Sequence, residues 1–305
     1  MEASAVGELE VVRRFNRSYT RRIGLLGDSY LDTGRPLGPS RVLFELGAGP
    51  THVGDLRRRL DLDSGYLSRL LRQLEHDRLV RSARDPSDGR QRIVRLTAQG
   101  RREWHRLDRR SEQIAARLVD PLGPRQRAAL ADALVTAERL LRAATVTFDE
   151  IDPGADDARF AMGRYFAELD VRFANGFDPG DGGADHDAVT MAAPGGAFVV
   201  VRTDGDVIGC GGVLRLDATT AEIKRMWIHP EWRGVGLAGR LLAHLESRAL
   251  SLGRRRVVLD TNESLTEAIA MYHRLGYAPT GRYNDNPYAH HWFEKHLEPV
   301  GRRPD

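Results

Sequence analysis

Residues 221–250, AEIKRMWIHPEWRGVGLAGRLLAHLESRAL, decide the fold of the second half of this chain. A strand pattern over Ile223–Ile228 is followed by Arg233–Ala238, RGVGLA, which opens a helix. That helix is expected to bury Leu237, Leu241, Leu242, Leu245 and Ala249. Glycines just ahead of a helix leave backbone N–H groups bare at the positive end of its dipole. The stretch therefore predicts a site for an anion such as a diphosphate.

Three phosphate-binding patterns can be compared with this loop. A P-loop needs G-x-x-x-x-G-K-[ST], and no Lys follows here. A dinucleotide fingerprint needs G-x-G-x-x-G at the start of a βαβ unit and an acidic residue about 20 positions later, and residues 234–239 have these glycine offsets. The acyl-CoA pyrophosphate pattern, R/Q-x-x-G-x-G/A, is satisfied by Arg233, Gly236 and Ala238. A plain strand-to-helix turn remains the alternative explanation of the glycines.

A second pattern lies downstream, in residues 257–283. A strand ends at Asp260, Asn262 follows, and a helix carries Ala268 and Tyr272, four residues before Gly276 and an aromatic residue. This order resembles the second half of the site of GNAT acetyltransferases, and the loop at 233–238 resembles the first half. The likeness spans about residues 146–298 and implies that two parallel strands splay apart around acetyl-CoA.

The GNAT resemblance implies direct transfer of an acetyl group from acetyl-CoA to an amine. Backbone N–H groups of Met226, Trp227 and Ile228 would hold the pantetheine arm and polarise the thioester. Asn262 matches a residue that contacts this arm. The diphosphate would be held by Arg233 and the N–H groups of Gly234, Val235, Gly236, Leu237 and Ala238.

Two residues are candidates for proton transfer. Tyr272 would donate a proton to the departing thiolate, and Glu222, at the start of the central strand, is the candidate base, directly or through water. The alternatives are a core aromatic residue and a solvated carboxylate. An acceptor pocket for a cationic amine is expected to use Tyr283, Asp285, Tyr288 and His291, unless the tail is a hairpin with an ordinary turn at Asn284–Pro287.

Charge divides the chain. Residues 1–145 hold 28 Arg and no Lys against 19 acidic residues, a net charge of +9, whereas residues 146–305 hold 18 basic and 24 acidic residues, a net of −6. The two values sum to the overall +3. A basic half joined to an acidic half suggests that only the first half meets a polyanion, although a solvated surface would have the same composition.

The basic half contains two short helical patterns within residues 52–77. In the second, the leucines Leu67, Leu70, Leu71 and Leu74 share one face. The other faces carry Ser64, Tyr66, Ser68, Arg69 and Arg72, the side chains that a major-groove recognition helix needs. Strand patterns at Leu79–Arg84 and Arg92–Thr97 then flank a turn, forming a hairpin with Arg84, Arg90 and Arg92 at or near its tip. An arginine there could enter the minor groove of DNA.

The pattern D-P-x-D-x-R followed by L-T-x-x-G resembles the wing of MarR-family regulators. The matching residues are Asp85, Pro86, Asp88, Arg90, Leu96, Thr97 and Gly100. The likeness covers about residues 5–144 and implies a homodimer clasped through its first and last helices on pseudo-palindromic double-stranded DNA. In this family, the residue matching Asp88 orients the arginine matching Arg90. The alternative is a helical domain used only for dimerisation or protein contact.

These patterns predict two domains in 305 residues. We expect a mainly α winged helix-turn-helix domain at 1–145 and an α/β GNAT acyltransferase fold with a mixed central sheet at 146–305. Strands are predicted at 146–151, 198–202, 207–215, 223–228, 256–260, 277–283 and 290–297, with helices at 155–172, 235–252 and 264–275.

The remaining features concern metal binding and the cellular compartment of the protein. The single cysteine, Cys210, is expected to be a buried apolar residue, and the histidines show no metal-ligand spacing. With no apolar run near membrane-span length and no signal-peptide core, we expect a cytoplasmic protein without membrane contact. Two functions stay open: a regulator fused to an active acetyltransferase, or a regulator whose GNAT-like part only senses acetyl-CoA or another metabolite.

Overall fold

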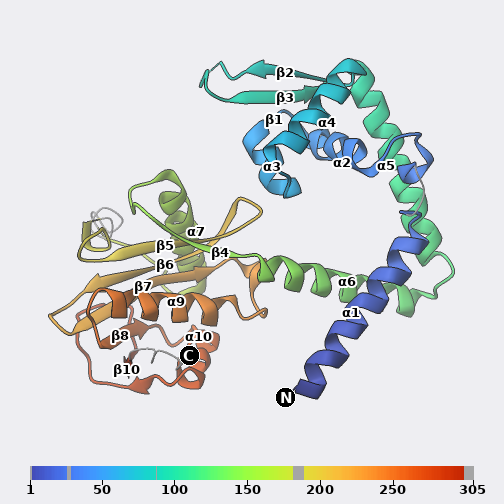
Figure 1. Cartoon of the computed structure of the whole chain (residues 1–305). Helices are drawn as coiled ribbons and strands as arrows, with labels where there is room; N and C mark the ends of the chain where they lie inside the picture. The colour runs from blue at the N-terminus through green and yellow to red at the C-terminus, as the bar shows by residue number, and fades with distance from the viewer. Residues whose placement is uncertain (1, 26–28, 87, 181–188, 299–305) are drawn as a thin grey trace. The chain divides into compact units, whose positions relative to one another are not determined.

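The computed structural model describes residues 2–25, 29–86, 88–180 and 189–298. Contacts within the chain divide it into an N-terminal unit, Met1–Leu134, and a C-terminal unit, Val135–Asp305 (Figure 1). The dividing line falls inside helix α6 (Pro124–Ala144). The boundary between a regulatory and a catalytic domain at residue 145 stays a prediction, because the contact division at residues 134 and 135 does not test function. Ser87, in the predicted wing turn, lies outside the described residues.

The N-terminal unit consists mainly of helices. They are α1 (Glu2–Arg22), α2 (Leu37–Glu45), α3 (Val53–Leu60), α4 (Ser64–His76), α5 (Ala98–Val119) and the start of α6, with short 3₁₀ turns at Tyr30–Asp32 and Leu46–Ala48. Strands β1 (Thr51–His52), β2 (Val80–Arg84) and β3 (Arg92–Leu96) form an antiparallel sheet in the order β1-β3-β2. The predicted leucine face of α4 is buried in one apolar cluster with residues of α2, α3, α5 and the sheet. Strand β1 was not predicted, because two residues carry no periodicity.

The L-T-x-x-G pattern joins the sheet to α5. The Thr97 hydroxyl donates to the carbonyl oxygen of Arg78 at 2.6 Å and accepts from the Gly100 N–H at 3.0 Å, so it caps the helix. A Cβ atom at Gly100 would collide with the carbonyl group of Leu79. The motif therefore sets how closely α5 approaches the base of the hairpin.

The C-terminal unit is a mixed sheet covered by helices on both faces. Its strands are β4 (Thr147–Ile151), β5 (Ala197–Thr203), β6 (Asp206–Arg215), β7 (Thr220–Ile228), β8 (Arg256–Thr261), β9 (Ala278–Pro279) and β10 (His291–His296), in the order β4-β5-β6-β7-β8-β10-β9. Its helices are α7 (Asp156–Arg172), α9 (Leu237–Ser251) and α10 (Thr266–Arg274), with a 3₁₀ turn at Pro230–Trp232. Among the described strands only β7 and β8 pair in parallel. The predicted fold class is confirmed.

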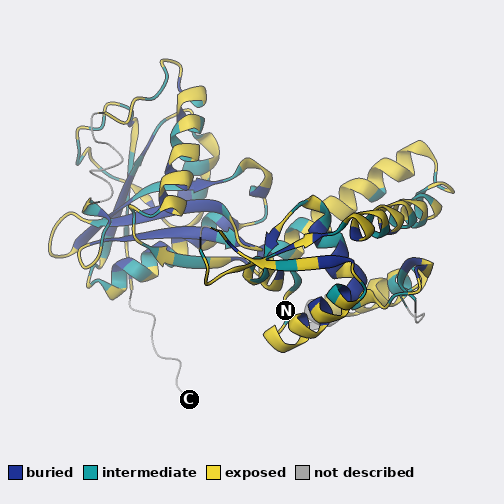
Figure 2. Ribbon diagram, turned by 90° about the horizontal axis from the view of Figure 1, so that it is seen from above, coloured by how far each residue is buried: buried dark blue, intermediate teal, exposed yellow. Residues whose placement is uncertain are grey.

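Alternation along β5 explains why both faces are covered. Val199 and Val201 belong to the apolar cluster that includes α9, whereas Phe198 and Val200 belong to the cluster that includes α7. The strands are thus buried on both sides, as Figure 2 shows in dark blue. Cys210 is fully buried, as predicted.

The central strands separate near their middle. Pairing of β7 with β8 runs from Thr220–Arg256 to Glu222–Val258 and stops there. On its other side, β7 shifts register against β6 in a bulge at Arg225, which has a φ of +57°. The bulge bends β7, and the far ends of β7 and β8 are left without mutual pairing, as the predicted splay requires.

One predicted strand is much shorter than expected. Residues 277–283 were predicted as a strand, but pairing is limited to Ala278 and Pro279 against Glu294 and Phe293. The backbone N–H of Thr280 still donates to the carbonyl oxygen of Trp292 at 2.9 Å, so the contact with β10 extends one residue past the proline. The other predicted strands and helices of this unit are confirmed within three residues at each end.

The last part of α6 belongs to the C-terminal unit. Ala143 is buried in the α9 cluster, and its carbonyl oxygen accepts a hydrogen bond from Arg240. The Arg142 guanidinium lies 4.6 Å from the ring centre of Trp232 and 2.7 Å from Asp204. This helix end is therefore packed beside the segment that leads into the glycine loop.

Candidate functional site

The first cavity, here called the glycine-loop cavity, has a volume of about 760 Å³ and lies among the end of β7, the start of α9, α7 and α10. Most residues predicted to hold acetyl-CoA line it: Met226, Trp227, Ile228, Arg233, Gly234, Gly236, Leu237 and Ala238. Val235 and Asn262 are not among its lining residues. The cavity is thus built largely from one continuous stretch of sequence.

The glycine loop has the geometry that an anion needs. Gly234 and Gly236 have φ values of +80° and +81°, a region that side chains disfavour, and a Cβ added at either would meet open space. Gly236 is the N-cap of α9, and the first N–H groups of a helix have no intrahelical partners. The loop therefore offers backbone donors, a helix dipole and room, so its residues fit the diphosphate of an acyl-CoA.

Arg233 lines this cavity and is also held by contacts within the protein, and its predicted role in binding the diphosphate stays a prediction. Its Nε donates to the carbonyl oxygen of Ile228 at 2.9 Å, and its Nη2 lies 2.5 Å from a carboxylate oxygen of Glu168 on α7. Burial opposes ionisation of Glu168, but hydrogen bonds from Arg233 and Trp227 outweigh it and lower the pKa of this carboxyl. The arginine thus ties the loop to β7 and α7. Sequence reasoning missed Glu168, because nothing local links it to the loop.

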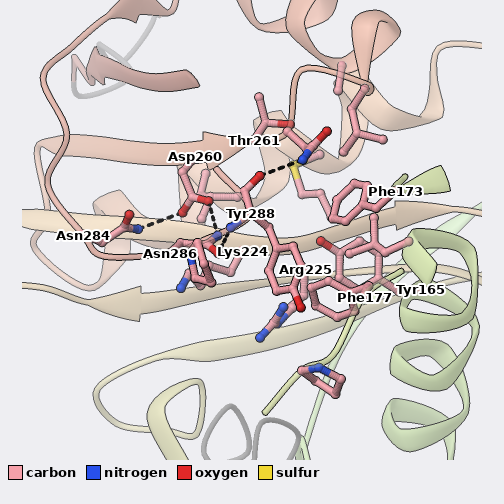
Figure 3. A pocket seen from close by; sticks show the side chains of 18 of the residues that line it. Tyr165, Phe173, Phe177, Lys224, Arg225, Asp260, Thr261, Asn284, Asn286 and Tyr288 are labelled. Atoms are coloured by element: carbon pink, nitrogen blue, oxygen red, sulfur yellow. Dashed lines mark hydrogen bonds between the residues drawn. The ribbon is translucent and has the colours of Figure 1, made fainter. Parts of the chain in front are cut away.

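A second cavity, here called the Asp260 cavity, has a volume of about 460 Å³ and opens between the splayed ends of β7 and β8. Its labelled lining residues in Figure 3 are Tyr165, Phe173, Phe177, Lys224, Arg225, Asp260, Thr261, Asn284, Asn286 and Tyr288. The aromatic rings gather on one side of the view and Asp260 lies on the other. The cavity therefore has an apolar and a polar side.

Tyr272 lines both cavities. It is buried on α10 and packs against Tyr277 and Phe293, with ring centres 5.7 Å apart in each case. Burial raises the pKa of its hydroxyl, and the charge of Asp260 acts in the same direction. The phenol is therefore protonated at neutral pH, at the place where the two cavities meet.

Asp260 is held by two side-chain amides. Asn284 Nδ2 donates to its Oδ1 at 2.8 Å, and Asn286 Nδ2 donates to its Oδ2 at 2.6 Å (Figure 3). Sequence reasoning noted Asp260 only as the end of a strand. The available signal was its place at the carboxyl end of a parallel strand, where ligand sites of open sheets form.

Glu222, the predicted base, lies behind this cavity and is not among its lining residues. It is 3% exposed and accepts hydrogen bonds from Tyr283 at 2.9 Å and Asn284 at 3.2 Å, with Lys224 Nζ at 3.5 Å. Burial raises the pKa of its carboxyl. Its role as base stays a prediction, and the geometry would require water between it and an acceptor.

Of the four residues predicted to line an acceptor pocket, only one lines the Asp260 cavity. Tyr288 lines the Asp260 cavity, whereas Asp285 is fully exposed and pairs with Arg282 at 3.0 Å. His291 and Tyr283 do not line it. Asn262, predicted for the cofactor arm, lines this cavity instead, and its Nδ2 donates to the carbonyl oxygen of Tyr288 at 2.7 Å.

The predicted recognition helix is α4. The exposed side chains are those expected: Ser64, Tyr66, Ser68, Arg69 and Arg72. Asp63 caps the helix by accepting from the Tyr66 N–H at 2.9 Å. The guanidinium of Arg69 lies 5.6 Å from the ring centre of Tyr66.

The hairpin β2–β3 carries the predicted wing. Arg84 and Arg90 are exposed, and Asp88 accepts hydrogen bonds from the backbone N–H of Arg90 at 3.0 Å and from the Gln91 amide at 2.9 Å. Asp88 therefore fixes the backbone that carries Arg90. Hydrogen bonding to Gln91 and Arg90 lowers the pKa of Asp88.

A histidine that the sequence analysis passed over links the wing to α3. His52 Nε2 lies 2.6 Å from Oδ2 of the buried Asp85, and this hydrogen bond raises the pKa of His52. His52 also precedes α3 directly as its N-cap residue.

Helices α1 and α6 both expose large apolar side chains. On α1 they are Leu9, Val11, Val12, Phe15 and Tyr19, and on α6 they are Leu134, Val135, Leu140 and Leu141. Isolated exposed apolar residues are common, but contiguous groups on helices mark surfaces that bind protein.

The helices among the described residues are all too short or too polar to cross a membrane. Within the same described residues, no group of His, Cys, Asp and Glu side chains is arranged to hold a metal ion.

Comparison with known proteins identifies both parts of the chain. The acetyltransferase (GNAT) family model matches residues 165–277, and the MarR family model matches residues 33–91. The IAA acetyltransferase of Azospirillum brasilense is 32% identical over 131 residues, which are 42% of this chain and 85% of that protein. The uncharacterized N-acetyltransferase YjgM of Escherichia coli is 33% identical over 114 residues, 36% of this chain and 68% of that protein.

Among solved structures, a GNAT family acetyltransferase from Elizabethkingia anophelis with acetyl-CoA bound is 17% identical. The match covers 50% of this chain and 98% of that one, with a TM-score of 0.39. The predicted resemblance to the two families is confirmed by the family models. The chain belongs to the acetyltransferase (GNAT) family, with a segment that matches the MarR family ahead of the acetyltransferase region.

Proposed function

We propose that this protein is an acetyl-CoA-dependent N-acetyltransferase that transfers acetyl directly to an amine and is joined to a DNA-binding regulator. The observation that carries the enzymatic part is Tyr272, a protonated phenol where the glycine-loop cavity meets the Asp260 cavity. One cavity fits an acyl-CoA and the other fits an acceptor. Residues 1–145 are assigned the regulatory role and 146–305 the catalytic role.

Acetyl-CoA would supply the acetyl group, which it carries as a thioester. The solved GNAT structure from Elizabethkingia anophelis has acetyl-CoA bound. The N–H groups from Gly234 to Ala238 would hold the diphosphate at the start of α9. The N–H groups of residues 226–228 would hold the pantetheine arm and polarise the thioester carbonyl. Arg233 would act mainly by fixing the loop through Ile228 and Glu168.

Side chains of this protein would then accept and donate the protons that the reaction moves. The acceptor nitrogen must be neutral to form the C–N bond, so one ammonium proton leaves first, to Glu222 through water. Tyr272 donates its proton to the sulfur as the C–S bond breaks. The nitrogen loses a second proton on becoming an amide, which restores the phenol. The products are the acetylated amine and CoA thiol, with one proton released.

The direct test measures CoA release from acetyl-CoA across amino acids, aromatic amines, polyamines, aminoglycosides and lysine peptides. Turnover with at least one amine, above the rate without amine, is the expected result. Calorimetry with acetyl-CoA provides an independent reading. Absence of acetyl-CoA binding at high concentration would remove the enzymatic proposal.

The regulatory part would bind double-stranded DNA as a homodimer. The exposed arginines Arg69 and Arg72 on α4 and Arg90 on the wing would contact the phosphates and the grooves of DNA with their positive charge. The apolar faces of α1 and α6 supply surfaces for the second copy. Since DNA and acetyl-CoA are both intracellular ligands, we place the protein in the cytoplasm. Gel shifts on the promoter region of its own gene, and sedimentation for the dimer, test this part.

A second candidate function is sensing without catalysis. It is favoured by the contact between Arg142 of α6 and Trp232, because Trp232 also lines the glycine-loop cavity. Occupation of the cavity could thus alter the end of α6. Acetyl-CoA binding that changes DNA affinity, without turnover of any amine, would favour this function over the enzyme.

A further inference from the structure

We infer that the acceptor is a small cationic amine carried on a flat apolar body, and that Asp260 binds its ammonium group. This inference rests on the proposed N-acetyltransferase function and names its substrate class. The Asp260 cavity carries it, because one carboxylate and an aromatic wall line the same space of about 460 Å³ beside Tyr272.

The carboxylate is preorganised for a cation. Two of the side chains that hydrogen-bond to Asp260, Asn284 and Asn286, donate from neutral amides. They fix the two oxygens in place without neutralising the charge. A bound ammonium would supply the opposite charge in a half-buried site, where a charge-assisted hydrogen bond is stronger than in water.

The aromatic wall joins two distant segments. The Tyr288 ring lies 4.9 Å from Phe177 and 5.7 Å from Phe173, centre to centre, and is stacked on Phe173. The Tyr288 hydroxyl accepts a hydrogen bond from the Asp178 N–H at 2.9 Å, which ties the segment that follows α7 to the 284–288 segment. The wall is thus rigid, and a flat apolar body packs well against aromatic faces.

The two cationic side chains that line the cavity, Lys224 and Arg225, already contact other groups. Lys224 lies 3.5 Å from Glu222, and the Arg225 guanidinium lies 5.0 Å from the ring centre of Phe166. Asp178 is exposed at the rim. Asp260 is therefore the carboxylate best placed, within the described residues, to meet an ammonium group beside Tyr272.

The test compares Asp260→Asn with Asp285→Asn in the full-length protein. Both changes remove one carboxylate and keep its shape, but Asp285 is fully exposed and does not line the cavity. With phenethylamine as acceptor, Asp260→Asn should raise KM about tenfold or more, as expected for loss of a hydrogen-bonded charge. Asp285→Asn should leave it unchanged. Equal acetyl-CoA affinity and unfolding temperature show that the variants are folded.

Further acceptors separate the parts of the inference. Phenylalanine adds a carboxylate to the same body, so its preference over phenethylamine would identify an amino acid as the source of the amine. Phe177→Ala should raise KM for phenethylamine but not for ethylamine. A lysine peptide or spermidine used more efficiently than both aromatic acceptors would overturn the inference.

The outcomes distinguish this inference from the proposed function. Turnover of phenethylamine with the same KM in wild type and Asp260→Asn discards the role of Asp260 and keeps the enzyme. Calorimetric binding of phenethylamine to the CoA-loaded protein, lost in Asp260→Asn but without turnover in wild type, keeps the site and discards the enzyme. No binding and no turnover discards the inference, whatever other amine is acetylated.

Discussion

The two units of this protein hold their arginines differently. In the N-terminal unit, Arg69 and Arg72 on α4 and Arg90 on the hairpin are exposed. In the C-terminal unit, Arg233 beside the glycine loop is bound to Glu168 and to the carbonyl oxygen of Ile228. These three arginines present their charge to solvent, whereas Arg233 fixes the backbone beside the glycine loop.

This difference corresponds to two ways of binding an anion. Exposed side chains act additively, are screened by salt and can be removed without disturbing the fold. A backbone loop at a helix start depends on dihedral angles and on space, so it tolerates little change. Variants of the C-terminal unit should therefore show the larger, salt-independent effects.

The largest effect is expected from Tyr272→Phe, which removes a proton donor and nothing else. If Tyr272 is the acid, kcat should fall about a hundredfold or more, with acetyl-CoA affinity unchanged. Because burial raises the pKa of Tyr272, the wild-type acid should stay protonated and cause no loss of kcat between pH 7 and 9. Steady-state kinetics with acetyl-CoA and a working amine provide both readings.

Tyr277→Phe is the matched control. Tyr277 is buried nearby and donates to Glu246 at 3.0 Å, but it lines neither cavity. Its kcat should stay close to wild type. A Tyr272→Phe variant no slower than Tyr277→Phe would assign Tyr272 to the core alone.

The next effect tests the glycine loop itself. Gly236→Ala places a Cβ in open space at a φ of +81°, where the donor's diphosphate would lie. The change should weaken acetyl-CoA binding about tenfold and lower the free energy of unfolding by about 1–2 kcal/mol through backbone strain.

Gly253→Ala separates these two consequences. Gly253 has the same φ of +81° and the same open surroundings, but it lies at the other end of α9. It should lose similar stability and keep its acetyl-CoA affinity, as measured by calorimetry and thermal unfolding. Equal losses of affinity would mean that the loop does not hold the diphosphate.

A smaller effect is expected from the exposed arginines of the N-terminal unit. Arg90→Ala should weaken DNA binding and reduce the slope of log affinity against log salt by about 1, as for one lost phosphate contact. Arg125→Ala, an exposed arginine at the start of α6, should leave both unchanged. Fluorescence anisotropy at several salt concentrations measures the slope. An unchanged slope for Arg90→Ala would remove the wing from the DNA-binding surface.

The smallest effect concerns the link between wing and α3. Hydrogen bonding to Asp85 raises the pKa of His52 above 6.5 in the folded protein. The stability that this pair contributes is therefore fully present below pH 6.5 and is lost as pH rises through the raised pKa. Thermal unfolding from pH 5.5 to 8 should show a small decline, reduced in His52→Gln. Identical pH profiles for the two proteins would contradict the assignment.

Where candidate residues lie within one continuous stretch, sequence reasoning located side chains that line the cavities, and their roles stay predictions. The loop at 233–238 and Tyr272 could be predicted because a strand, glycines and a helix follow one another in the chain. Asp260, Asn284 and Asn286 could not be predicted as a group, because side-chain contacts across 24 to 26 residues bring them together. The Arg233–Glu168 pair has a separation of 65 residues and no local signal.

The packing of α6 has a practical consequence for dissecting the molecule. Composition changes at residue 145, and cutting there would discard Ala143, whose side chain fills the apolar interior behind α9. The same cut would take Arg142 from the indole of Trp232 and leave the Arg240 guanidinium without its acceptor on Ala143. An isolated acetyltransferase fragment should therefore begin ahead of Val135. A shorter fragment would expose apolar surface and precipitate for reasons unrelated to catalysis.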